Sequence, residues 1–192
     1  MSEAESSPII DTLCLLVGGL DKSQFGIISA NGVSPINEVR SACPNVDARR
    51  VDDPGYLIGQ VPDLTSIITN LRTAYPSIDR VVVVSHSFGW EAGRRAAATG
   101  VVDFMIAVDP VGLAFAAEAT HHWPSPDGVR QPGIFAKATK QPPEPFIAQL
   151  NIPDGPAIDE YPECRHNEIV HHPRFIASII AACNGTATGE TT

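Results

Sequence analysis

Residues 81–93, with the sequence VVVVSHSFGWEAG, carry the strongest structural signal in the chain. Four consecutive valines are typical of a strand that is buried on both faces of a parallel sheet. The alanine-rich stretch EAGRRAAA at residues 91–98 predicts a helix immediately afterwards. The five residues SHSFG therefore form a sharp turn between a central strand and a helix, and this arrangement indicates an α/β fold.

The turn has small residues where its geometry requires them, since Ser85 and Gly89 lie two positions before and two positions after Ser87. A sharp strand-to-helix turn brings its flanking backbones together, and its strained apex residue projects its side chain from the sheet edge. N–H groups at the start of the helix point the same way and stabilise a negatively charged oxygen. Ser87 is therefore a candidate nucleophile. The alternative is an ordinary serine in a strand-to-helix connection.

Strand and helix patterns alternate on both sides of this turn. Short apolar runs predict strands at residues 12–17, 46–51, 80–84, 101–108 and 133–138. Capping residues, prolines and apolar spacing predict helices from Pro35 to about Cys43, from Asp63 to Tyr75, over residues 91–98 and from Pro173 to Asn184. This order predicts a three-layer α/β/α fold with a mostly parallel central sheet that is flanked by helices on both faces.

The composition fits one domain of this kind. The chain has 192 residues, of which 43% are hydrophobic and 18% charged. This length is sufficient for a hydrophobic core, and the apolar content is too high for a disordered chain. We expect a single domain over residues 11–185, with flexible tails at residues 1–10 and 186–192.

The net charge of −9 argues against nucleic acid as the main partner, because such a surface repels phosphate backbones. The sequence contains no run of 18 apolar residues, so it predicts no membrane span. The first residues lack the basic start and apolar run of a signal peptide, so we expect a cytoplasmic protein or a secreted mature form whose signal has been removed. The cysteines form no CxxC pair, and the sequence leaves open whether Cys164 and Cys183 pair.

The segment around Ser87 resembles the nucleophile elbow of the α/β-hydrolase superfamily, whose pattern is Gly-x-Ser-x-Gly. Ser85 stands where the first glycine of that pattern would be, and serine is small enough to be tolerated there. The resemblance implies a serine esterase or lipase-like enzyme, in a minimal form without a cap domain, with Ser87 as the nucleophile.

The same resemblance implies a histidine base on the loop before the last helix. His166 lies seven positions before Pro173, a spacing similar to that of the family, and is the candidate base. His171 and His172 are alternatives, although a capping or solvated role is the simpler account at the start of a helix. No carboxylate completes a known zinc spacing with these three histidines, so no metal site is predicted.

The base needs a carboxylate that holds its tautomer and stabilises its charged form. Asp109 follows the predicted strand FMIAV, and the carboxyl ends of parallel strands lie at the same edge of the sheet. Lipases of the pancreatic type have their acid in a similar Asp-Pro motif one strand after the nucleophile. Asp109 is therefore the candidate acid, with Glu144, Asp154 and Asp159 as alternatives.

The resemblance also implies an oxyanion hole built from two backbone N–H groups. One belongs to Phe88, the residue after the nucleophile, and the other to the loop after the first strand, at Leu20 or Asp21. Glycine lets the backbone approach a ligand closely, so we expect Gly19 and Asp21 to contact substrate.

Trp123 lies in the long segment after the candidate acid. It is a candidate substrate contact as part of a flap, and the alternative is a buried aromatic side chain in a surface loop. His86 and Trp90 flank the elbow, and we expect structural roles for both.

Together these residues predict a hydrolase that cleaves a carboxylic ester through a Ser-His-Asp triad and an acyl-enzyme intermediate. Its partner would be a small-molecule ester or acyl substrate, and it would need no cofactor. A thioesterase or acyltransferase with the same triad is one alternative. A non-catalytic α/β-hydrolase-like binding protein is the other.

Overall fold

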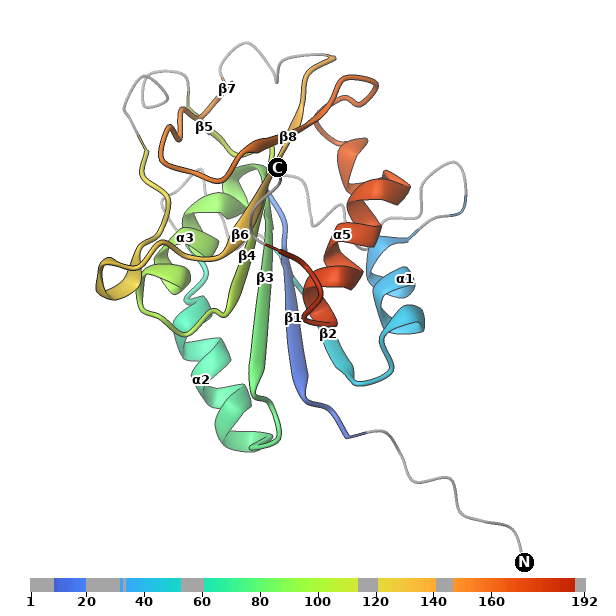
Figure 1. Ribbon diagram of the computed structural model, residues 1–192, viewed down its shortest axis with the longest axis vertical. Helices are drawn as coiled ribbons and strands as arrows, with labels where there is room; N and C mark the ends of the chain where they lie inside the picture. The colour runs from blue at the N-terminus through green and yellow to red at the C-terminus, as the bar shows by residue number, and fades with distance from the viewer. Residues whose placement is uncertain are drawn as a thin grey trace, which may run out of the picture.

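The computed structural model describes residues 9–19, 32, 34–52, 61–113, 121–140 and 147–188. They form a sheet with helices on both faces (Figure 1). The strands are β1 (Thr12–Val17), β2 (Val46–Val51), β3 (Arg80–His86), β4 (Phe104–Val108), β5 (Val111–Leu113), β6 (Gly133–Ala138), β7 (Ile147–Gln149) and β8 (Ile158–Tyr161). The helices are α1 (Pro35–Ala42), α2 (Leu64–Ala74), α3 (Trp90–Ala98) and α5 (Pro173–Cys183).

The central sheet contains six parallel strands in the order β2-β1-β3-β4-β6-β8. The strand order reverses between β1 and β3, and ligands of open α/β sheets bind outside the carboxyl ends of the strands at such a point. The antiparallel pair of β5 and β7 lies at that end of the molecule (Figure 1). The topology therefore directs the residues after β1, β3 and β4 to one edge.

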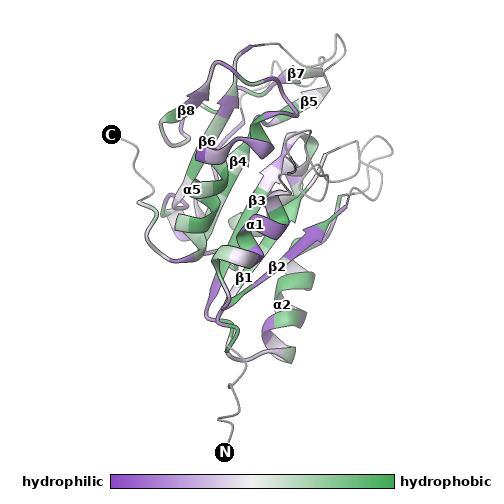
Figure 2. Cartoon of the chain, turned by 90° about the vertical axis from the view of Figure 1, so that its right-hand side faces the viewer, coloured by the Kyte–Doolittle hydropathy of each residue, from purple (hydrophilic) through white to green (hydrophobic). Residues whose placement is uncertain are grey.

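Alternate residues of each strand face opposite sides of the sheet and build two cores. Cys14 and Leu16 of β1 belong to the core beneath α1 and α5, whereas Leu13 and Leu15 belong to the core beneath α2 and α3. Figure 2 shows that the central strands are largely hydrophobic, while the edge strand β2 carries hydrophilic residues. The predicted three-layer α/β fold with a mostly parallel sheet is confirmed.

The predicted helices and longer strands lie where the sequence pattern indicated. Asp63 caps α2, and its carboxylate accepts the N–H of Ser66 at 3.0 Å. Ser34 precedes α1 as expected but makes no side-chain capping bond. The strand predicted over residues 101–108 begins only at Phe104, and Asp103 before it bonds to the neighbouring strand through both its side chain and its backbone N–H. The short strands β5, β7 and β8 were not predicted, since none of them has a long apolar run.

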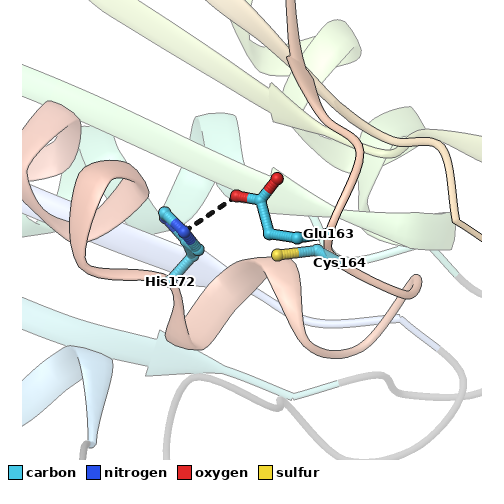
Figure 3. A group of neighbouring side chains, drawn as sticks. All are labelled: Glu163, Cys164 and His172. Carbon is cyan, nitrogen blue, oxygen red and sulfur yellow. Dashed lines mark ion pairs between the residues drawn. The ribbon is translucent and has the colours of Figure 1, made fainter.

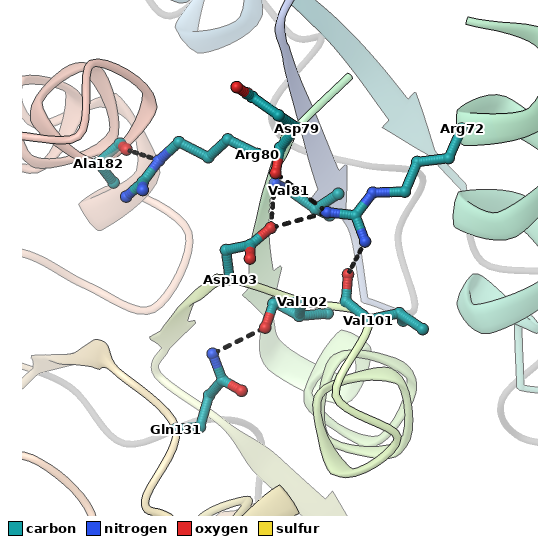
Figure 4. A network of polar contacts seen from close by, with 9 residues as sticks. All are labelled: Arg72, Asp79, Arg80, Val81, Val101, Val102, Asp103, Gln131 and Ala182. Carbon is teal, nitrogen blue, oxygen red and sulfur yellow. Dashed lines mark hydrogen bonds and ion pairs between the residues drawn. The ribbon is translucent and has the colours of Figure 1, made fainter. Parts of the chain in front are cut away.

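Polar side chains tie together the amino ends of β3 and β4, at the end of the sheet opposite the edge described above (Figure 4). The Asp103 carboxylate accepts the N–H of Val81 at 2.7 Å and pairs with Arg72 of α2 at 3.0 Å. Arg80 donates to the Ala182 carbonyl at 2.9 Å, and Gln131 donates to the Val102 carbonyl at 3.0 Å. These bonds fix the helices to the sheet far from the candidate site.

No described helix is long and apolar enough to cross a membrane. Cys164 and Cys183, whose pairing the sequence left open, are both free thiols. After α5, the N–H groups of Thr186 and Ala187 both bond to the Ala181 carbonyl, at 2.9 and 3.1 Å.

Candidate active site

The turn between β3 and α3 has the sharp geometry that the sequence predicts. Ser87 is only 6% exposed and has a φ of 59°, a left-handed conformation that is uncommon for a residue other than glycine. A Cβ at Gly89 would lie 2.8 Å from the carbonyl oxygens of Val17 and Gly18, so only glycine fits against the end of β1. The backbone strain at Ser87 is held by this tight packing.

Ser85, the departure from the family pattern, is accommodated by a glycine on the facing helix. A Cβ at Gly93 of α3 would lie 2.8 Å from the Ser85 Oγ and 3.0 Å from its Cβ. The missing side chain at Gly93 therefore provides the space that the hydroxymethyl group at Ser85 occupies. The Ser85 hydroxyl donates to the Ile106 carbonyl at 3.4 Å, so it is satisfied inside the sheet.

Three polar side chains that lie far apart in the sequence form one line at this edge. The His166 Nε2 lies 2.9 Å from the Ser87 Oγ, and the His166 Nδ1 bonds to the Asp109 carboxylate. Because a carboxylate only accepts hydrogen bonds, Nδ1 carries the proton and Nε2 presents its lone pair to the serine hydroxyl. This is the tautomer in which a histidine can take a proton from Ser87.

Asp109 is held firmly for this contact. It follows β4 with a φ of 41°, a left-handed conformation that aspartate tolerates better than most residues, and its side chain is fully buried. Its backbone N–H donates to the Ala136 carbonyl of β6 at 2.7 Å. Gln149 of β7 donates to the carboxylate from the other side. No local motif in the sequence marks Gln149 as a neighbour of the acid.

The alternative acids have other partners. Asp154 bonds to the Trp123 backbone N–H at 2.9 Å and to His122 at 3.0 Å. Asp159 accepts the Tyr161 hydroxyl at 2.8 Å and pairs with Arg174. Glu144 lies outside the described residues. Among the described carboxylates, it is therefore Asp109 that the structure brings to His166.

His172 has the capping role that was the simpler account of it. Its Nδ1 accepts the N–H of Arg174 at the start of α5, and its Nε2 pairs with Glu163 at 2.9 Å (Figure 3). The Cys164 thiol lies nearby, and one donor atom from each of the three side chains falls within 4.8 Å of the others. Because Nδ1 accepts, Nε2 carries the proton and donates to Glu163, so its lone pair is not free for a metal ion.

Gly19 lies directly against the candidate nucleophile. A Cβ at this position would be 2.6 Å from the Ser87 Cβ, 2.8 Å from its Oγ and 3.3 Å from the Phe88 N. The backbone after β1 thus lies directly against the Ser87 hydroxyl and the Phe88 nitrogen, with no space for a side chain at this position. Leu20 and Asp21, the expected second oxyanion donor and its alternative, lie outside the described residues.

For the serine chemistry that we propose below, we expect Gly19→Ala to lower the rate of ester hydrolysis by about 100-fold, because a displacement near 1 Å at the reacting groups has an effect of this size. The added methyl group would push the Ser87 hydroxyl out of line. Gly155→Ala is the control, since the nearest atom to its Cβ is 3.2 Å away and belongs to Ile152. Initial rates on a chromogenic ester measure both variants, and an active Gly19→Ala would contradict the close approach.

Trp123 lies in the core and not in an exposed flap, so its side chain is not placed to contact substrate as the sequence suggested. Its side chain is only 2% exposed and packs at a tilt against Trp90, with 5.7 Å between the ring centroids. The indole N–H donates to the Gln131 carbonyl at 2.8 Å, which satisfies its one polar group inside the core. The alternative of a buried aromatic side chain is the one that the structure supports, and Trp90 packs in the core as expected.

His86 has a structural role that the sequence only partly indicated. Its Nε2 donates to the His166 carbonyl at 3.0 Å, and the two rings pack in a tilted arrangement with 4.7 Å between centroids. The residue before the candidate nucleophile thus fixes the backbone of the candidate base. Burial, with the neighbouring His166 as the second cause, lowers the pKa of His86 to about 3.

The pKa of His86 predicts a loss of stability in acid. The unfolded chain takes up a proton at this residue below pH 6.5, but the folded protein does so only near pH 3. The free energy of unfolding should therefore fall as the pH falls through this window, by up to about 1.4 kcal/mol per pH unit from this residue. Urea unfolding at several pH values measures it, with His86→Gln as the control. Identical pH slopes for both proteins would contradict the prediction.

The comparisons with known proteins agree with this architecture at the level of the fold. No known protein family and no curated protein matches the sequence. Among solved structures, the crystal structure of Aspergillus fumigatus lipase B matches with a TM-score of 0.52 and 15% sequence identity. The match covers 97% of this chain and 55% of the lipase, so the chain spans about half of the length of that protein. The chain therefore has an α/β fold similar to that of a lipase.

Proposed function

We propose that the protein is a serine hydrolase that cleaves carboxylic esters. The observation that carries this proposal is the line from Ser87 through His166 to Asp109, at the edge where ligands of α/β sheets bind. The similarity of the fold to that of a lipase is consistent with it. A fold alone does not define a reaction, so the proposal rests on the site.

The proposed reaction begins when the Ser87 Oγ attacks the ester carbonyl carbon and His166 Nε2 takes the serine proton. The carbonyl electron pair moves to oxygen and forms an oxyanion. When the carbonyl forms again, the alcohol leaves with the proton from His166, and an acyl-enzyme remains. Water then attacks the acyl group, His166 takes its proton, and the carboxylic acid leaves as the proton returns to Ser87. Every step uses protein groups and water.

Backbone N–H groups near Ser87 would stabilise the oxyanion. The N–H of Phe88 lies at the start of the turn into α3, and its nitrogen is 3.3 Å from where a Cβ at Gly19 would be. Donors held in place in this way stabilise charge in the transition state without reorganisation, by about 3 kcal/mol for each donor.

The test is labelling of the folded protein with a fluorophosphonate, followed by peptide mass mapping. An activated serine attacks the phosphorus atom and displaces fluoride, so we expect a stoichiometric label on Ser87. Rates with matched esters and thioesters then identify the class of acyl substrate. Comparing water with an added alcohol identifies the acceptor. Folded protein without label or turnover would contradict the proposal and favour a non-catalytic binding protein.

A further inference from the structure

Gln149 is the second side chain that contacts the Asp109 carboxylate. Its Nε2 donates to Asp109 Oδ1 at 2.5 Å, while His166 Nδ1 bonds to Oδ2. Among the described residues, these are the two side chains that hydrogen-bond to this carboxylate. Asp109 is fully buried, so bulk water does not replace either of them.

The same amide nitrogen is anchored to the central sheet. Nε2 also donates to the carbonyl of Ala138, the last residue of β6, at 3.0 Å. Both partners are oxygen atoms that only accept, so the amide orientation is fixed and both of its N–H hydrogens are used. Gln149 therefore connects the acid to a rigid strand by a two-bond bridge.

The small sheet of β5 and β7 brings Gln149 to this position. Val111, two residues after Asp109, pairs with Gln149 in the antiparallel register, and the Leu150 N–H donates to the Pro110 carbonyl at 3.0 Å. Backbone contacts of the two residues that directly follow the acid thereby bring Gln149 to Asp109, although the two lie 40 positions apart in the sequence.

We propose, on the basis of the proposed hydrolase function, that Gln149 is a positioning residue that orients the Asp109 carboxylate toward His166. The carboxylate can rotate about its Cβ–Cγ bond, and a donor on Oδ1 fixes this rotation with Oδ2 facing the imidazole. Gln149 thus acts through Asp109 on His166 and does not touch substrate. The β5–β7 pair, which the sequence did not indicate, has the role of carrying this residue.

Gln149→Leu tests the proposal, because leucine keeps a similar volume and removes both N–H donors. We expect kcat to fall about 10- to 100-fold with KM unchanged, since a buried acceptor then lacks its donor and the affected contact matters in the transition state. Gln131→Leu is the matched control. Gln131 is a buried glutamine that donates to a carbonyl at the opposite end of the sheet (Figure 4), so its loss lowers stability without changing kcat.

Gln149→Glu gives a second readout that a merely structural role would not produce. Two carboxyl groups in contact cannot both be ionised, so Gln149→Glu binds one extra proton, which the new carboxyl group donates to Asp109 Oδ1. We expect Gln149→Glu to retain more of the wild-type kcat than Gln149→Leu at low pH and to lose it as the pH rises and this shared proton dissociates. Neither Gln149→Leu nor Gln131→Leu should show this additional loss at high pH.

The proton on His166 Nδ1 provides a readout that needs no activity. In the resting protein this proton should give a low-field NMR resonance, which Gln149→Leu shifts or broadens and Gln131→Leu leaves unchanged. If all three proteins share the same resonance and Gln149→Glu shows no additional loss at high pH, the positioning role is wrong. A wild-type protein that neither hydrolyses esters nor labels at Ser87 would contradict the proposed function, and the resonance would still decide the role of Gln149.

Discussion

Replacing Ser87 by alanine is expected to abolish ester hydrolysis and fluorophosphonate labelling while the protein remains folded. The His166 Nε2 faces the Ser87 Oγ at 2.9 Å. The substitution removes this oxygen, which is the atom proposed to attack the acyl carbon. Loss of the nucleophile lowers kcat by about 10⁶-fold in enzymes that use this chemistry. The measurement is the initial rate on a chromogenic ester, with circular dichroism and thermal unfolding of the same samples.

Ser178→Ala is a suitable control for this variant. Ser178 lies on α5, where its hydroxyl donates to the Arg174 carbonyl at 3.1 Å. Ser178→Ala removes a serine hydroxyl without a change near the candidate site, so full activity is expected. Hydrolysis that persists in Ser87→Ala would end the assignment of the nucleophile and with it the proposed acyl-enzyme.

Asp109→Asn is expected to lower kcat by about 10⁴-fold, the effect known for an acid-to-amide change that traps the wrong histidine tautomer. The neighbour Gln149 makes this outcome specific. Its N–H requires the amide oxygen of the new side chain, so the amide NH₂ turns toward His166 Nδ1. The imidazole then has to carry its proton on Nε2, where it faces Ser87 and cannot act as a base.

Two matched variants separate this effect from a general loss of charge. Asp154→Asn and Asp159→Asn remove carboxylates that bond to Trp123 and Tyr161 and not to His166, so we expect kcat close to that of the wild type. Thermal unfolding of each variant distinguishes lost stability from lost turnover. If Asp159→Asn or Glu144→Gln produces the large loss in kcat and Asp109→Asn does not, the acid is misassigned.

The candidate site was only partly visible in the sequence, for a physical reason. The turn at Ser87 is local: a buried strand, small residues and a helix follow one another within thirteen positions, and each has a strong conformational preference. The position of Asp109 could be inferred from sheet topology, since parallel strands end at a common edge. The sequence left three other carboxylates open, because loops determine which of them reaches the histidine.

The surroundings of Trp123 and Gln149 could not be inferred from the sequence, because they depend on packing between distant segments. Trp123 lies in a proline-rich stretch that resembles a surface loop, but its ring is buried on Trp90 and its N–H is satisfied by Gln131. Gln149 lies in a three-residue strand that exists only through its pairing with β5. Short strands of this kind have little intrinsic preference, and tertiary contacts stabilise them.

Local sequence patterns were sufficient to predict the three-layer α/β architecture and the strained serine turn. Both follow from local propensity and from apolar runs that must be buried on two faces. Which side chains meet at that turn depends instead on the folded arrangement of the chain. The contact between Ser87 and His166 spans 79 positions and that between His166 and Asp109 spans 57. Hydrogen bonds across such separations depend on where the sheet edge and its loops bring each donor and acceptor, and no local pattern of residues encodes that position.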